Sequence, residues 1–114
     1  MGITFAEVEI GGRTYRALVD TGFNGEVLVS RRVAEEAGLK PFRTKERVTV
    51  DGRRVRVEVA VAVIRLWGEE SEVFVEILDE LPLDVLIGVQ ALERLGYAVS
   101  PVTGRLEKVG LLAV

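Results

Sequence analysis

Residues 17–22 read Ala-Leu-Val-Asp-Thr-Gly, and the interpretation of the rest of the chain starts from this segment. Upstream of it, apolar and polar residues alternate over 14–19, which is the period of a half-buried strand. The pattern predicts a strand that ends at Asp20 and places its carboxylate at the rim of a core. Thr21 and Gly22 then turn the chain. Asp and Gly are also common in ordinary turns, so the segment needs support from its surroundings.

The same alternation predicts further strands on both sides of this segment. The glycine pair at 11–12 and Asp51-Gly52 indicate tight hairpin turns. Valine occupies every odd position from 55 to 63, so we expect a long strand with one apolar face that runs from solvent into the core. Gly68 should end it, with a solvated loop over 69–72. The expected strands cover 6–10, 14–19, 27–29, 47–50, 54–63, 73–77, 84–88, 97–99 and 105–109.

Two short helices are expected between the strands. Ser30 is a suitable N-cap for a helix through Ala37, and Gly38 is suited to the position after its C-cap. A second helix is expected over 89–95, with Gly96 ending it. The sequence therefore predicts a single domain over 1–114 that is all-β, mainly antiparallel, and carries two short α-helices.

Composition restricts the possible chemistry. The chain of 114 residues is 48% hydrophobic and 29% charged, as expected of one globular domain, and it contains neither cysteine nor histidine. Disulfides, thiolate metal sites and nucleophiles activated by histidine are thereby excluded. Any hydrolytic chemistry must rest on carboxylates, hydroxyls, lysine or a carboxylate-bound metal.

Charge and hydropathy bear on partners and location. The net charge of −3 argues against nucleic-acid binding, which normally needs a basic excess. The longest apolar run, over 57–64, has the length of a strand and cannot cross a bilayer. The N-terminus lacks a secretion-signal pattern, so we expect a cytoplasmic protein without membrane contact. Twelve arginines against three lysines, with many glutamates, would suit a thermophile.

Four segments together resemble the retropepsin-like aspartic proteases, in particular their small single-domain prokaryotic members. The segments are Ala17 to Gly22, the Asp51-Gly52 hairpin, Leu86-Ile87-Gly88 with the helix residues 90–96, and the closing strand after Gly104. They span nearly the whole chain. The resemblance implies a closed, barrel-like retropepsin-type fold.

The resemblance also implies a role for each residue of the Asp-Thr-Gly motif. Asp20 would pair with Asp20 of a second subunit, because the chain has one such motif and half the length of two-lobed relatives. The two carboxylates would share one proton and activate a water molecule between them. Thr21 would bond across the dimer, and Gly22 would let the substrate backbone approach. Neither a metal nor a cofactor is required.

Two further segments are weighed against the family pattern. Val50, Asp51 and Gly52 would form the flap that closes over a bound peptide, although an ordinary surface hairpin explains them equally well. Phe23 stands where many relatives carry Ala or Ser, which would narrow or reshape a subsite.

Other carboxylates are interpreted structurally. Asp84 could be an intrachain partner of Asp20, but Val85 follows it rather than Thr or Ser, so we expect a structural residue before a buried strand. Glu69, Glu70 and Glu72 could be proposed as metal ligands, but we interpret them as part of a solvated loop.

The sequence thus favours a homodimeric aspartic endopeptidase that cleaves extended peptides. One alternative is a dimeric peptide-binding module on the same fold with little or no activity, because fold does not fix function. Another is a monomeric structural β domain. Residues 2–10 and 111–114 are the expected dimer-forming strands, unless the tail folds back on its own subunit.

Overall fold

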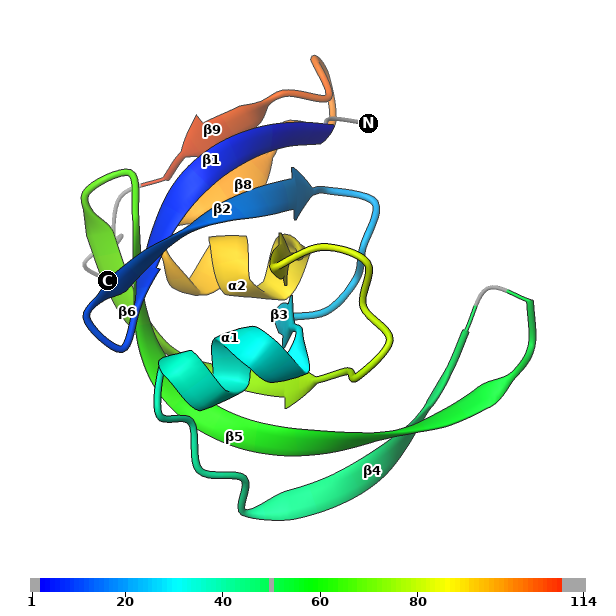
Figure 1. Ribbon diagram of the computed structural model, residues 1–114. Coiled ribbons are helices and arrows are strands. Elements are labelled where there is room, and N and C mark those ends of the chain that lie inside the picture. The colour runs from blue at the N-terminus through cyan, green and yellow to red at the C-terminus, as the bar shows by residue number, and fades with distance from the viewer. Residues whose placement is uncertain (1–2, 50, 110–114) are drawn as a thin grey trace.

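The computed structural model describes residues 3–49 and 51–109 (Figure 1). Two short helices accompany nine strands in this part of the chain. In chain order the elements are β1 (Ile3–Ile10), β2 (Arg13–Asp20), β3 (Val27–Val29), α1 (Arg31–Glu36), β4 (Arg43–Val48), β5 (Arg54–Leu66), β6 (Glu69–Ile77), β7 (Val85–Ile87), α2 (Val89–Arg94), β8 (Tyr97–Val99) and β9 (Leu106–Lys108).

Six strands close into a barrel. Their order is β1-β2-β7-β3-β6-β5, and the ring closes because β1 pairs again with β5 over Val8–Ile10. Strand β4 lies outside the ring as the hairpin partner of β5, and β8 with β9 forms a separate two-stranded sheet. The pairings β2–β7 and β3–β6 are parallel, and the others are antiparallel. The predicted all-β, barrel-like and mainly antiparallel fold is confirmed.

The barrel interior is filled by branched aliphatic side chains. Burial of such side chains from water is the main driving force for folding. The largest fully buried side chains include Ile10, Ile64, Leu66, Ile77 and Ile87 from the strands and Leu92 from α2. Val33 and Ala34 of α1 belong to the same core, so both helices cover it.

The predicted helices form, and their ends follow the expected signals. The Ser30 hydroxyl accepts a hydrogen bond from the Val33 amide at 3.3 Å, which is an N-cap contact for α1. Gly38 and Gly96 follow the C-caps with φ of 69° and 93°, in the left-handed region that glycine adopts without strain.

The solvated loop expected over 69–72 is wrong. These residues begin β6, and Glu69 pairs with Leu66 in a continuous antiparallel register. The turn is made by Trp67 and Gly68 alone, with φ of 52° and 83°, as a two-residue hairpin turn of the primed type requires. Tryptophan rarely adopts positive φ, so residue type at position 67 carries no turn signal.

The predicted apolar face of β5 is only partly confirmed. Val57 and Val59 are buried, but Val61 and Val63 are 43% and 50% exposed. The opposite face, with Ile64 and Leu66, enters the barrel core instead. Valine at every odd position therefore does not mark a single buried face. The strand passes from the hairpin into the barrel wall, and the inside of the barrel lies on the even-numbered side.

Among the described residues, no helix is long and apolar enough to cross a membrane. Several predictions concern residues outside the described ranges. These are Val50 of the expected flap, Gly2 at the N-terminus and the tail 111–114.

Candidate active site

Asp20 is the last residue of β2, and its carboxylate is held by the turn that follows. The Gly22 amide donates a hydrogen bond to Asp20 Oδ1 at 2.8 Å, and the Phe23 amide donates to the Asp20 carbonyl at 3.1 Å. An aspartate that binds the amide two residues on stabilises this kind of turn. Asp20 and Thr21 are half-buried, while Gly22 is exposed. The carboxylate thus lies at the rim of the barrel, as its place after an apolar strand predicts.

The start of α2 supports the loop that follows Asp20. The amides of Gly88, Val89 and Gln90 donate hydrogen bonds of 2.7, 2.9 and 2.9 Å to the carbonyls of Glu26, Phe23 and Gly25, respectively. Backbone hydrogen bonds of this kind leave the loop few alternative conformations. The loop therefore takes its shape from a segment more than sixty residues away in the sequence.

Close packing at two glycines fixes the same contact. A Cβ atom on Gly88 would lie 2.5 Å from the Gly25 carbonyl oxygen and 2.6 Å from Cδ2 of Phe23. A Cβ on Gly25 would lie 2.5 Å from Cζ of Phe23. The Phe23 ring thus packs back onto its own loop and onto the start of α2. Both glycines are needed for the close approach, which their sequence context did not reveal.

Strand pairing brings the first and third segments of the family resemblance together. In the parallel β2–β7 pair, Leu18 lies opposite Leu86 and Val19 opposite Ile87. Strand β7 also pairs antiparallel with β3. The Asp20 loop and Gly88 therefore leave the same edge of the barrel from neighbouring strands.

A family model described as aspartyl protease matches residues 6–91. The chain belongs to the retropepsin-like aspartyl protease family. The match runs from within β1 into α2, so it includes Asp20, the β4–β5 hairpin and the loop support at Gly88. A comparison with curated proteins finds no match.

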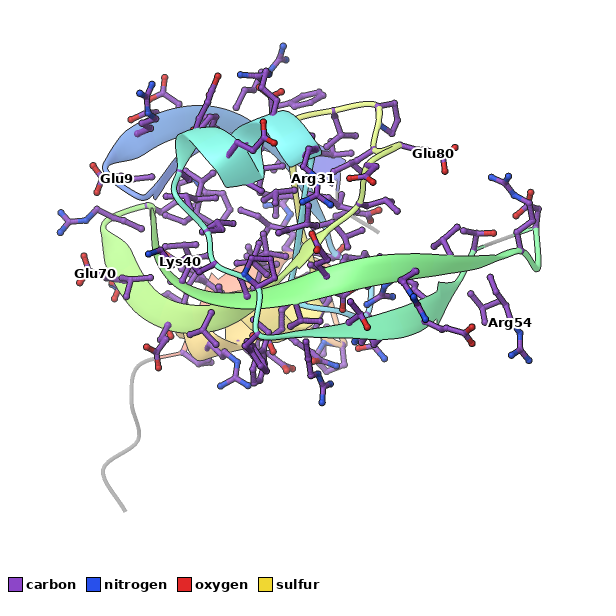
Figure 2. The ribbon with its side chains drawn as sticks, turned by 60° about the horizontal axis from the view of Figure 1, so that its bottom comes forward. Glu9, Arg31, Lys40, Arg54, Glu70 and Glu80 are labelled. Atoms are coloured by element: carbon purple, nitrogen blue, oxygen red, sulfur yellow. The ribbon has the colours of Figure 1, made fainter. Side chains whose placement is uncertain are left out.

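In this aspartyl protease, the β4–β5 hairpin extends away from the barrel. Figure 1 shows its end on the same side of the molecule as the loop after β2, and Figure 2 shows Arg54 projecting near that end. The turn is closed by hydrogen bonds from the Thr49 amide to the Arg53 carbonyl at 2.7 Å and from Gly52 to Thr49 at 2.9 Å. Asp51 and Gly52 lie exposed at the turn, and Val50 falls outside the described residues. Their contact with substrate remains a prediction.

Arg47 connects the hairpin to the Asp20 loop. Its guanidinium lies 5.2 Å from the centre of the Phe23 ring, within the range of a cation–π contact. It also donates two hydrogen bonds to Glu76 on β6, of 2.6 and 2.7 Å. Lys45 adds an ion pair to Glu76 at 2.8 Å. The middle and outer parts of β4 are thereby tied to β6 of the barrel wall.

Glu76 is a buried carboxylate that the sequence did not single out. It alternates with Val75 and Ile77, a pattern that predicts an exposed side chain, yet the residue is 7% exposed. Burial raises the pKa of Glu76, but hydrogen bonds from Arg47 and then Lys45 outweigh it, so the pKa lies below its ordinary value. The carboxylate is therefore ionised in the folded protein at neutral and mildly acidic pH.

Glu26 fixes the other side of the loop. Its carboxylate accepts hydrogen bonds from Nε of Arg94 at 2.7 Å and from the Phe74 amide at 3.1 Å, and its side chain is 10% exposed. A charged residue directly before the buried strand β3 is the available sequence signal. Glu26 thus joins the loop to α2 and β6.

A pocket of about 190 Å³ opens between the Asp20 loop and the hairpin. It contains cationic side chains from β4, and polar groups from the loop and α2. Its lining consists of Asn24, Gly25, Glu26, Arg43, Lys45, Arg47, Val59, Phe74, Glu76 and Gln90. A hollow next to the loop that carries Asp20 is a natural place for a substrate side chain.

Three of the other acidic residues singled out in the sequence have structural partners: Asp84, Glu69 and Glu70. Asp84 accepts a hydrogen bond from Arg32 on α1, in agreement with the structural interpretation. Glu69 and Glu70 pair with Lys108 and Arg65, respectively. No cluster of three or more Asp or Glu residues suited to a metal occurs within residues 3–49 and 51–109.

A larger hollow, of about 520 Å³, is formed by the β1–β2 turn, the end of α1 and the adjoining parts of β5 and β6. Glu9, Lys40 and Glu70 belong to it, and Figure 2 shows them at the end of the molecule opposite Arg54. It contains no residue of the Asp20 loop. We therefore place the candidate active site at the smaller pocket and the Asp20 loop.

Proposed function

We propose that the protein is a homodimeric aspartic endopeptidase in which one Asp20 from each subunit forms the catalytic pair. Membership of the aspartyl protease family supports peptide-bond hydrolysis as the reaction. The observation that carries the proposal is the position of Asp20, on a turn held by the Gly22 amide at the rim of the barrel. Because the chain has one Asp-Thr-Gly, a complete pair needs two copies.

The chemistry follows from placing two carboxylates side by side. Two carboxyl groups at hydrogen-bond distance cannot both ionise without a large repulsion between their charges, so the pair holds one proton. The ionised Asp20 takes a proton from a water molecule, which attacks the scissile carbonyl carbon. The protonated Asp20 donates a hydrogen bond to the carbonyl oxygen and stabilises the tetrahedral intermediate. Collapse of the intermediate breaks the C–N bond, and the leaving nitrogen takes the proton that Asp20 accepted from the water, so the pair again holds one proton.

This mechanism requires one protonated and one ionised carboxylate, so we expect activity at acidic to mildly acidic pH. Thr21 is proposed to bond across the dimer and Gly22 to admit the substrate backbone. Asp51 and Gly52, at the exposed hairpin turn, are proposed to cover the peptide together with Val50.

The subunits are proposed to meet through the first strand. Residues 3–7 of β1 pair with β2 on one edge, whereas β5 pairs with the other edge only from Val8 onward. Phe5 is 55% exposed on this segment, with the Arg16 guanidinium 3.9 Å from its ring centre. A strand edge that has no partner among the described residues, with an exposed aromatic residue on the same segment, is suited to pairing with a second chain. The tail 111–114 remains part of the proposal from the sequence.

Asp20→Asn tests the catalytic assignment. Asparagine has nearly the same shape but cannot take up the proton, so peptide cleavage should fall to background. Cleavage is measured on a varied peptide mixture by mass spectrometry, with unfolding temperature and sedimentation velocity as controls for fold and assembly. Wild-type rates in a pure, dimeric variant would rule out Asp20 as the catalytic group.

A second candidate function is peptide binding without turnover on the same dimer. It is favoured by the Phe23 ring, which fills space beside the Asp20 loop at Gly25 and Gly88. It predicts saturable peptide binding by the wild type and no cleavage at any pH from about 3 to 8, a range that spans the ordinary carboxyl pKa and its usual shifts. Cleavage that depends on Asp20 would exclude it.

A further inference from the structure

Cationic side chains of β4 face the Asp20 loop across the pocket. Cross-strand partners point to the same face of a sheet, so Arg43, which pairs with Val59, lies on the same face as Glu76, which also pairs with Val59. Lys45 and Arg47 follow at alternate positions along β4 and point to that face as well. All four side chains line the pocket.

The two carboxylates of the pocket are already satisfied. Glu76 is bound by Arg47 and Lys45, and Glu26 is bound by Arg94. Arg43, in contrast, has no ion-pair partner within the part of the chain that the structure describes. With Arg94 included, the cations of this site exceed its carboxylates by two. An incoming carboxylate would therefore meet free donors rather than displace an existing pair.

Donor geometry also suits a carboxylate. Arg47 binds Glu76 through Nε and one terminal nitrogen, and Lys45 uses one contact to the same residue, so each retains further N–H groups. Val59 and Phe74 add apolar groups to the pocket lining, against which the methylene groups of a side chain could pack. Gln90 and Asn24 add neutral polar groups at its edge.

We infer that this pocket is a specificity subsite that selects an acidic side chain, glutamate or aspartate, of the bound peptide, with Arg43 as its principal contact. The inference rests on the proposed peptide-cleaving function, because it assigns the pocket to a bound peptide. A charge-assisted hydrogen bond from Arg43 should favour glutamate over the isosteric glutamine by about tenfold in Kd.

Binding to the Asp20→Asn protein tests this inference without requiring turnover. The probes are fluorescent peptides with Phe-Leu at the centre and Glu, Gln or Lys placed at each flanking position in turn. Near pH 6, where glutamate is ionised, we expect one position at which Glu binds about tenfold tighter than Gln. Adding Arg43→Gln should remove most of that difference while leaving the Gln peptide unaffected.

Arg56→Gln is the matched control. Arg56 lies on the same hairpin, and its loss changes the net charge equally. Val55 and Val57 share the pocket face of β5 with Val59, so Arg56, which lies between them, points away from the pocket. The Glu preference should survive this substitution. Three outcomes would each overturn the inference. The Glu and Gln peptides bind equally, none of the peptides binds, or the Glu preference is lost in Arg56→Gln but kept in Arg43→Gln.

Cleavage by the unmodified enzyme is measured separately on the same peptides. Glu-selective binding without cleavage would retain the subsite and reject the protease proposal. Cleavage without a Glu preference would retain the protease and reject the subsite.

Discussion

At the scale of single residues, the conformation of the loop that follows Asp20 depends on a few close contacts. The carboxylate is oriented by the Gly22 amide, and Phe23 and Gly25 pack against Gly88 at the start of α2. At Gly88 the backbone lies so close to the Gly25 carbonyl and the Phe23 ring that even one added methyl group would not fit without a shift.

Gly88→Ala should displace the Asp20 loop. The added methyl group would meet the Gly25 carbonyl oxygen at 2.5 Å, and backbone atoms cannot yield as a flexible side chain can. We expect a loss of about 1–3 kcal/mol in the free energy of unfolding. Faster amide hydrogen exchange at Val89 and Gln90 should accompany it, because both amides bind the displaced loop.

Gly12→Ala is the control for this substitution. Gly12 has φ of 78°, and a methyl group added there would meet nothing within 4 Å, so alanine adds backbone strain without a clash. It should cost about 1 kcal/mol and leave exchange at Val89 and Gln90 unchanged. Unchanged exchange in Gly88→Ala would show that the loop tolerates the methyl group.

Among the elements, the β4–β5 hairpin is tied to the barrel by a partly buried charge cluster. Arg47 and Lys45 of β4 meet Glu76 of β6, and Arg47 also covers Phe23. Among the described residues, β4 pairs with β5 and with no other strand. The cluster therefore determines how firmly the hairpin is held beside the Asp20 loop.

Glu76→Gln should lower stability at neutral pH and remove a step in its pH dependence. The folded-state pKa of Glu76 lies below its ordinary value of 4.5. Its contribution is therefore complete above that value and is lost as pH falls through the lower, folded-state pKa. We expect the variant to be less stable by about 2 kcal/mol at pH 7, and the difference should shrink in strong acid.

Urea unfolding at a series of pH values measures this difference. Glu46→Gln is the control, because Glu46 pairs with Arg54 at 3.3 Å with both side chains mostly exposed. Such a surface pair contributes less than about 1 kcal/mol. A Glu76→Gln deficit that stayed constant down to the lowest pH would contradict the assigned pKa direction.

At the scale of the whole molecule, one chain supplies half of the proposed active site. Every part of the loop architecture is supplied by one chain, but the second Asp-Thr-Gly is not. If two chains share one site, a dimer that contains one inactive subunit should have no activity.

Mixing wild-type protein with an equal amount of Asp20→Asn protein tests this dependence. If subunits exchange at random, half of the wild-type chains enter mixed dimers, so activity should fall to about half that of the wild type alone. The measurement is the initial cleavage rate after incubation. The double variant Asp20→Asn with Phe5→Glu is the control, since a disrupted first strand should prevent mixing and preserve activity. A rate unaffected by excess Asp20→Asn would contradict a shared site.

The local sequence identified most of the elements and the position of the candidate site. Alternation marked the strands, Ser30 and Gly38 marked the ends of α1, and the apolar run before Asp20 placed it at the end of a strand. Local pattern failed where a turn lacked its usual residues, at Trp67-Gly68, and where a charge was buried by distant partners, at Glu76.

The sequence by itself restricted the type of chemistry, because a chain without histidine or cysteine leaves carboxylates, hydroxyls, lysine or a carboxylate-bound metal for hydrolysis. Among these, the family resemblance of its Asp-Thr-Gly favours carboxylates. Only the tertiary structure decided what surrounds Asp20. The support from Gly88, the Glu76 cluster and the cationic pocket all join segments far apart in the chain. Such contacts depend on strand order and barrel closure, which residue periodicity does not encode.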